Sequence, residues 1–257
     1  MSSTVEKKVR IIRNYVNGAF IEPANSGYID VENPSTGEII GSVPLSTAAE
    51  VNRTVEIAYE AYKGWSKTPV ARRVSYLFKL YELMRDHEED LARQIVEENG
   101  KSMPDALAEM KRAIENVEVA CGMPVLQQGE NIIGSSFDID GEVIRLPLGV
   151  FGMIAPFNFP AMVPFWFIPY AIATGNTFIV KPSKQVPLTL QMVAEYFHEA
   201  GLPPGVFNVV NGDREVANAL MEHRRIKGIS LVGSTPVARQ VARKCAESGK
   251  RYQAMGG

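Results

Sequence analysis

The spacing of apolar residues changes partway along the chain. In the first half, apolar positions recur every three or four residues in three segments, and this spacing predicts helices. The predicted helices cover residues 51–65, 69–99 and 104–119. The segment Ser46-Thr47-Ala48-Ala49-Glu50 resembles a capping box and marks the start of the first helix. Asn99-Gly100 marks the end of the second.

Short apolar runs separated by turn residues predict strands in three places. Asn17-Gly18 divides the apolar residues of 11–21 and predicts a hairpin. Asn33-Pro34-Ser35-Thr36-Gly37 predicts a second turn between apolar runs. Residues 129–146 alternate between polar and apolar positions, which favours a pair of strands.

From Gly149 onward, short apolar runs alternate with helical patterns of 10–15 residues. The predicted strands cover 149–155, 177–180, 206–210, 228–232 and 251–255. The predicted helices between them cover 161–174, 188–200, 214–223 and 235–248. This alternation predicts an α/β fold, a Rossmann-like open parallel sheet of about five strands with helices on both faces. A helical segment precedes it.

One polar side chain, Asn158, lies in a run that holds no charged residue from Gly149 to Val180. The run is long enough to cross a membrane, but Pro156, Pro160, Pro164 and Pro169 are too closely spaced for one continuous helix, and we expect no membrane span. An amide in apolar surroundings needs partners. Asn158 is therefore either a tie for the backbone or a donor toward a ligand.

Composition excludes several classes of function. The chain has 27 basic and 29 acidic residues, so nothing calls for a nucleic-acid or anionic-membrane partner. Its first twelve residues lack the apolar core of a secretion signal. Cys121 and Cys245 are isolated, which fits a reduced cytoplasm. His87, His198 and His223 show no metal-ligand spacing; we expect solvated positions and no metal site.

Polar residues follow each of the five predicted strands, where ligands of open parallel sheets bind. These segments are Phe157-Asn158, Lys181-Pro182-Ser183-Lys184, Asn211-Gly212, Gly233-Ser234-Thr235 and Gly256-Gly257. The first loop lacks the GxGxxG dinucleotide fingerprint. Gly233-Ser234-Thr235 is either a phosphate site or a plain helix N-cap. Lys181 is either a ligand for ribose or phosphate or a solvated strand end.

Together these segments resemble the aldehyde dehydrogenase superfamily. The resemblance rests on Asn17-Gly18, Asn33-Pro34-Ser35-Thr36-Gly37, Leu146-Pro147-Leu148-Gly149-Val150, Pro156-Phe157-Asn158-Phe159-Pro160, Val180-Lys181-Pro182-Ser183 and Gly233-Ser234-Thr235, in this order. The string over 155–164 and the ending Gln253-Ala254-Met255-Gly256-Gly257 are most similar to the methylmalonate-semialdehyde dehydrogenase branch, which makes acyl-CoA.

The resemblance implies that a cysteine thiolate attacks an aldehyde, that NAD accepts a hydride, and that CoA or water removes the acyl group. It implies that Asn158 donates to the oxyanion, Ala155 and Phe157 line the cofactor cleft, Lys181 reaches the adenine ribose and Ser234 binds the pyrophosphate. The remaining residues predicted at the cofactor site are Ser183, Lys184, Gln185, Gly212, Gly233 and Gly256. Residues 129–147 are similar to an oligomerisation arm, which implies a homodimer or homotetramer.

Three departures qualify this expectation. Neither Cys121 nor Cys245 matches the family's nucleophile, so we expect an amino-terminal portion that lacks the catalytic domain and is inactive. The position of the family's general base holds Ala254 or Met255, which favours CoA as the acyl acceptor. Lys184 replaces a ribose-binding acid, which leaves NADP as an alternative to NAD.

The expected organisation is a hairpin and helices in 1–128, the arm in 129–147 and the NAD(P)-binding α/β portion in 148–257. Two other functions remain open: a hydrolytic aldehyde dehydrogenase that releases a free acid, and a non-catalytic nucleotide-binding module.

Overall fold

The structure is a computed structural model that describes residues 9–23 and 27–257; the segment 1–8, used above against a secretion signal, lies outside them. The helices are α1 (Ala48–Trp65), α2 (Val70–Asp86), α3 (Glu88–Asn99), α4 (Met103–Cys121), α5 (Met123–Leu126), α6 (Met162–Phe165), α7 (Ile168–Ala173), α8 (Leu188–Glu199), α9 (Arg214–Glu222) and α10 (Thr235–Glu247). The strands are β1 (Arg10–Ile11), β2 (Asn14–Val16), β3 (Ala19–Ile21), β4 (Gly27–Glu32), β5 (Ile39–Leu45), β6 (Glu130–Ser136), β7 (Ile139–Val143), β8 (Val150–Ile154), β9 (Thr177–Lys181), β10 (Phe207–Val209), β11 (Ile226–Gly233) and β12 (Arg251–Gly256).

The central sheet has the order β12-β11-β8-β9-β10-β2-β3. Its first five strands are parallel and are the five predicted ones. The sheet also holds two strands that were not assigned to it, because the Asn17-Gly18 hairpin β2–β3 pairs antiparallel next to β10. Tyr15 pairs with Val209, and its ring centroid lies 6.3 Å from that of Phe207. The hairpin therefore covers an edge that β10 would otherwise expose.

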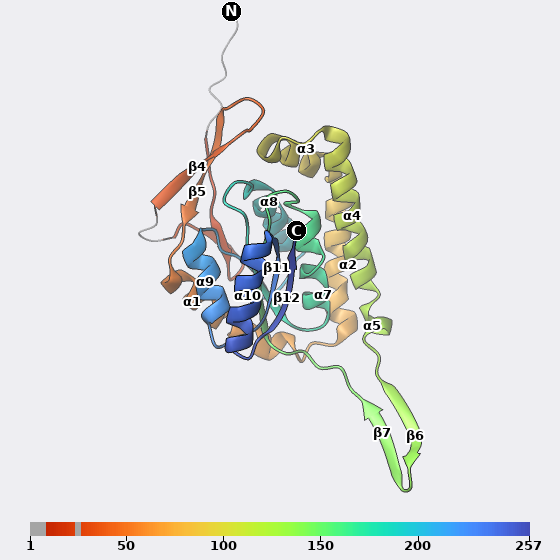
Figure 1. Cartoon of the computed structure of the whole chain (residues 1–257). Helices are drawn as coiled ribbons and strands as arrows, with labels where there is room; N and C mark the ends of the chain where they lie inside the picture. The colour runs from red at the N-terminus through yellow and green to blue at the C-terminus, as the bar shows by residue number, and fades with distance from the viewer. Residues whose placement is uncertain (1–8, 24–26) are drawn as a thin grey trace, which may run out of the picture.

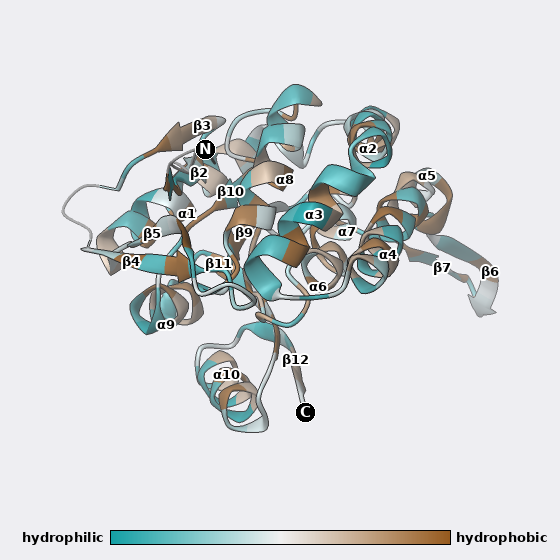
Figure 2. Cartoon of the chain, turned by 90° about the horizontal axis from the view of Figure 1, so that it is seen from above, coloured by the Kyte–Doolittle hydropathy of each residue, from teal (hydrophilic) through white to brown (hydrophobic). Residues whose placement is uncertain are grey.

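Helices cover both faces of the sheet, as the alternation predicted (Figures 1 and 2). On β9, Phe178 and Val180 pack into the core beneath α2, α4, α7 and α8, whereas Ile179 packs with α1, α9 and α10. All three side chains are at most 1% exposed. A strand that is buried on both faces has apolar residues at consecutive positions, and this is why the sequence predicted β9 clearly.

Two predicted helices are each divided in two. The segment 69–99 forms α2 and α3, because His87 leaves the helical conformation (φ −114°, ψ 22°) and three acidic residues then begin a new helix. The segment 161–174 forms the short helices α6 and α7. Pro169 lies in the first turn of α7, where its missing N–H breaks no helical hydrogen bond.

The predicted turn and cap chemistry is confirmed at the amino-terminal end of the chain. Asn17 and Gly18 have φ angles of 55° and 77°, the left-handed pair that a tight hairpin needs. Gly37 N donates to Asn33 O at 2.8 Å and closes the turn between β4 and β5. Thr47 and Glu50 form the reciprocal capping box of α1.

The strands β6 and β7 pair antiparallel and project from the body as a separate hairpin (Figure 1). The hairpin carries large apolar side chains that contact little else: Phe137 is 97% exposed and Ile133 is 81% exposed. Patches of this kind mark interaction surfaces. Among the described residues, no helix is both long enough and apolar enough to cross a membrane.

Candidate functional site

The strand order reverses beside β8. From β8 the chain proceeds through β9 to β10 on one side of the sheet, then returns to form β11 and β12 on the other. A crevice forms outside the carboxyl ends of strands at such a switch point. The loop after β8 carries Asn158 and the loop after β11 carries Ser234, and these two strands are neighbours in the sheet. The sheet therefore brings together two of the segments that the sequence indicated.

The loop after β8 presents Asn158 to solvent. Ala155 is buried, and its N donates to Lys181 O at 3.0 Å, whereas Phe157 and Asn158 are both exposed. Within 9–23 and 27–257, Asn158 takes part in a hydrogen bond through its backbone O, which accepts from Lys101 Nζ, and not through its side-chain amide. The interpretation of Asn158 as a tie for the backbone is therefore wrong, and its amide is free to donate to a bound molecule.

Side chains of α3, α4 and their connection hold the backbone of this loop. Asn99 Nδ2 donates to Phe157 O at 2.8 Å, and Lys101 Nζ donates to Asn158 O at 2.6 Å. Lys101 also pairs with Glu109, and its Nζ lies 3.9 Å from the centroid of the Phe159 ring.

Glu109 completes this group of contacts from within α4. Its Oε1 accepts from Ala161 N at 2.9 Å and from Met162 N at 3.1 Å, and its side chain is only 1% exposed. Sequence reasoning missed the roles of these three residues, because Asn99 marks a helix end, Lys101 lies in a short connection and Glu109 resembles an ordinary helix-surface residue. Their contacts fix the backbone on both sides of Asn158 and leave its amide free.

The loop after β9 carries two lysines in different environments. Lys181 is 7% exposed, and its Nζ donates to Pro182 O at 2.8 Å, so the alternative of a solvated strand end is wrong. Burial lowers the pKa of Lys181 to about 8. Lys184 is exposed and pairs with Asp213 Oδ2 at 2.8 Å. Ser183 Oγ accepts from Gln185 N at 3.3 Å and shapes the turn between them.

A pocket of about 450 Å³ lies between this loop and the turn of the β4–β5 sheet. Phe157, Lys184 and Gln185 contribute to its wall. Glu98 of α3 lines it too and caps α8 by accepting from Leu188 N at 2.7 Å and from Thr189 N at 2.9 Å. No local sequence pattern indicates this role. Burial raises the pKa of Glu98 to about 7, against the opposing effect of these hydrogen bonds.

Gly212 ends the loop after β10 in a conformation that few other residues adopt, with φ at +148°. A Cβ at Gly212 would lie 2.4 Å from Val216 Cγ2 and 3.2 Å from Ser46 N. The glycine therefore permits close packing of this loop, and Asp213 follows it on the exposed side.

The loop after β11 begins α10 without a side-chain cap. Ser234 occupies the N-cap position, as one of the two interpretations expected, but its hydroxyl makes no capping hydrogen bond. Gly233 pairs in register with Gly256 of β12. A Cβ at Gly256 would lie 2.9 Å from Thr235 Cα. The first amides of α10 thus keep their hydrogen-bonding capacity, and the helix end packs against a residue that must be small.

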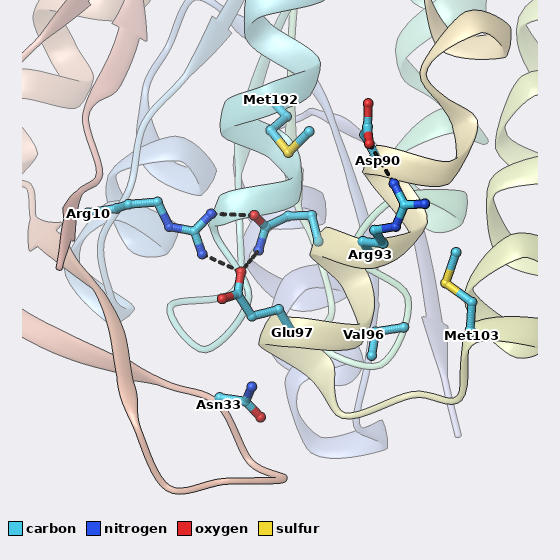
Figure 3. Close-up of a pocket in the computed structure, with 9 residues that line it drawn as sticks. Arg10, Asn33, Asp90, Arg93, Val96, Glu97, Met103 and Met192 are labelled. Atoms are coloured by element: carbon cyan, nitrogen blue, oxygen red, sulfur yellow. Dashed lines mark hydrogen bonds and ion pairs between the residues drawn. The ribbon is translucent and has the colours of Figure 1, made fainter. Parts of the chain in front are cut away.

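A second pocket, of about 540 Å³, lies away from the strand ends beside α3 (Figure 3). Arg10 Nη1 donates to Gln94 Oε1 at 2.6 Å, and Arg10 Nη2 lies 2.6 Å from Glu97 Oε2. Arg93 pairs with Asp90 at 2.9 Å. The arginines are engaged by neighbouring side chains, so this pocket gives no reason to infer an anion site.

The cysteines and histidines lie apart from the strand-end loops. Cys121 and Cys245 are buried, as expected for structural residues. The expectation of solvated histidines is wrong for His223, whose side chain is 12% exposed and whose Nδ1 accepts from Arg225 N at 3.2 Å. His198 is exposed, and the His87 side chain is 44% exposed. Among the residues with described positions, no cluster of potential ligands could hold a metal ion.

Residues 20–257 match the aldehyde dehydrogenase family model. The chain belongs to the aldehyde dehydrogenase family. It is 49% identical over 249 residues to malonate-semialdehyde dehydrogenase of Bacillus pumilus (strain SAFR-032), covering 97% of this chain and 51% of the relative. Malonate-semialdehyde dehydrogenase 1 of Geobacillus kaustophilus (strain HTA426) is 44% identical over 255 residues, covering 99% of this chain and 52% of the relative.

Solved structures agree with this assignment. Methylmalonate-semialdehyde dehydrogenase from Oceanimonas doudoroffii is 42% identical with a TM-score of 0.94, over 97% of this chain and 51% of that one. A putative methylmalonate-semialdehyde dehydrogenase from Sinorhizobium meliloti 1021, complexed with NAD, is 38% identical with a TM-score of 0.94, over 98% of this chain and 51% of that one. The chain thus spans about half the length of these relatives.

Proposed function

We propose that this chain forms the NAD-binding part of an aldehyde dehydrogenase that oxidises a carboxylated semialdehyde to an acyl-CoA, and that Asn158 supplies its oxyanion donor. The observation that carries the proposal is that β8 and β11 pair at the switch point of the sheet, where ligands of such sheets bind. The loop after β8 carries a free amide on a backbone held by Lys101, and the loop after β11 leads into a helix N-terminus without a side-chain capping bond. The malonate-semialdehyde dehydrogenase relatives suggest the substrate class.

The residues that follow these strands suit a dinucleotide. The free amides and the Ser234 hydroxyl at the start of α10 match a pyrophosphate, and Gly256 leaves room for this helix end. Lys181 has donors suited to ribose hydroxyls. Ala155, Phe157, Ser183, Gln185, Gly212 and Gly233 complete the proposed cofactor site. When bound, the nicotinamide supplies hydride acceptance.

Asn158 acts in this proposal by donating its side-chain N–H to the oxygen of a substrate carbonyl, which gains negative charge on nucleophilic attack. An amide already held in place loses little orientation entropy when it makes this bond. Lys101 and Asn99 hold the carbonyls of residues 157 and 158, so the loop backbone is fixed before substrate arrives.

Neither cysteine of the chain is proposed as the nucleophile. Burial raises the pKa of Cys121 to about 11 and also raises the pKa of Cys245, so both remain thiols at neutral pH. Ala254 and Met255, which precede the double glycine, accept no proton. This supports a thiol such as CoA, rather than an activated water, as the acyl acceptor.

We also propose that the β6–β7 hairpin is an arm that pairs with a second copy of the chain. The support is its exposed apolar surface, which includes Ile133 and Phe137.

Calorimetric titration of NAD into the chain tests the proposal. Wild type should bind NAD, Asn158→Ala should bind it equally well, and Gly256→Val should weaken binding by at least about tenfold, because its side chain displaces the start of α10. Failure of a natively folded chain to bind NAD would refute the cofactor site. NADH formation from malonate semialdehyde, with and without CoA, should stay at background, and turnover that a Cys121→Ala variant abolishes would contradict the assignment of the nucleophile.

A further inference from the structure

An ion pair connects the loops that follow β9 and β10. Lys184 Nζ lies 2.8 Å from Asp213 Oδ2, and the two side chains are 43% and 56% exposed. Asp213 directly follows Gly212, whose unusual backbone packs against Val216 and fixes where the next residue stands. The pair therefore lies at the rim of the proposed site, close to the buried Lys181.

Asp213 is a carboxylate at neutral pH. The hydrogen bond from Lys184 holds the pKa of Asp213 below its usual value, and the charge of Lys181 acts in the same direction. The Lys184 ammonium, in turn, already has a strong acceptor. A ligand that approaches the two loops meets the negative carboxylate of Asp213 and the Lys184 ammonium, which is already paired with that carboxylate.

We propose that Asp213, through its pair with Lys184, determines the choice between NAD and NADP. The inference rests on the proposed function, which brings the adenine ribose to Lys181. NADP differs from NAD in carrying a phosphate on the 2′-oxygen of that ribose. A carboxylate accepts a hydrogen bond from a 2′-hydroxyl but repels a 2′-phosphate, whereas a released lysine attracts it. With Asp213 present, the site prefers NAD.

This changes the expectation that the sequence raised. Lys184 stands where a ribose-binding acid was expected, and by itself it made NADP an alternative to NAD. The structure supplies an acid from the neighbouring loop instead, 29 residues further along the chain.

The test measures the dissociation constants of NAD and NADP for the whole chain by calorimetry at low ionic strength. Wild type should bind NAD at least about tenfold more tightly than NADP. Asp213→Asn should reduce this ratio at least about tenfold, mainly through tighter NADP binding. Adding Lys184→Met to Asp213→Asn should remove the gain. Asp213 stands at the N-cap of α9, and asparagine keeps an oxygen that can accept from Arg214 N, so the replacement should leave that helix intact.

Two controls separate the outcomes. Glu130→Gln makes the same charge change on the projecting hairpin and should leave both constants unchanged. If wild type binds neither nucleotide, the proposed function is wrong. If wild type binds NAD but Asp213→Asn leaves the ratio unchanged, or weakens both nucleotides equally, only the specificity proposal is overturned. Asp213→Ser should repeat the effect of Asp213→Asn, and a discrepancy between them would also count against it.

Discussion

Replacing Lys101 by methionine tests whether the ion pair with Glu109 fixes the loop that carries Asn158. The change removes the ammonium that binds both Glu109 and the carbonyl of Asn158, while the methionine side chain still packs against Phe159. The carboxylate of Glu109 then loses its counter-ion in a site where its side chain is 1% exposed.

The size of the stability loss depends on the hydrogen bonds that Glu109 retains in the variant. Removing one partner of a buried ion pair costs about 3–5 kcal/mol. Glu109 retains hydrogen bonds from Ala161 N and Met162 N, and Lys101 is itself 16% exposed, so we expect about 2–3 kcal/mol of lost unfolding free energy. In the Lys101→Met/Glu109→Gln double variant, the loss should fall short of the sum of the single losses by at least about 1 kcal/mol.

Urea unfolding followed by far-ultraviolet circular dichroism measures these free energies. Lys63→Met is the matched control, because Lys63 is 53% exposed and pairs with Glu60 on the surface; it should change stability by less than about 1 kcal/mol. Hydrogen exchange should speed up in 157–162 of Lys101→Met but not of the control. A loss below about 0.5 kcal/mol for Lys101→Met, together with additive single and double variants, would refute the reasoning.

Three further predictions concern other parts of the structure. Burial raises the pKa of Glu98 to about 7, so the folded chain holds a proton that the unfolded chain has lost, and stability falls as the pH rises. Wild type should lose roughly 2 kcal/mol between about pH 5 and pH 7, and a Glu98→Gln variant whose urea midpoint fell equally would contradict this. Gly212→Ala should lower the free energy of unfolding in urea by roughly 2–4 kcal/mol, because the added Cβ would clash with Val216. The control Gly249→Ala should lower it by about 1 kcal/mol, because Gly249 also has a positive φ (+63°) but has open space around it; equal losses would rule out the steric cause. Phe137→Ser should weaken self-association in sedimentation velocity without changing the thermal midpoint, and unchanged association would exclude this side chain from the proposed arm contact.

Elements that bury both faces or follow local rules were predictable from the sequence. Strand β9 is a continuous apolar run, and the turn at Asn17-Gly18 follows from backbone preferences alone. The break at His87 was not predictable in the same way. Three acidic residues follow His87, and their sequence is equally consistent with the start of a new helix and with the solvent-exposed face of one uninterrupted helix.

The site was predictable where its residues follow the strands and unpredictable where helices support it. Asn158 and Ser234 stand at strand ends, which a sheet of known order brings together. Glu98, Lys101 and Glu109 act through the placement of α3 and α4 against distant loops, and no local pattern marks them. The pairing of Lys184 with Asp213 likewise depends on which strands are neighbours.

The amino-terminal hairpin has a consequence for how the chain acquires its structure during synthesis. Asn17 N donates to Asn208 Oδ1, a partner 191 residues later, and the edge of the sheet stays open until that partner emerges from the ribosome. At about 5–20 residues per second, the wait is roughly 10–40 s. During that time Tyr15 and Phe20 lack their place in the sheet, and closing so long a loop slows folding. Completion of the sheet is therefore a late event, and this interval is when the nascent chain is most open to aggregation.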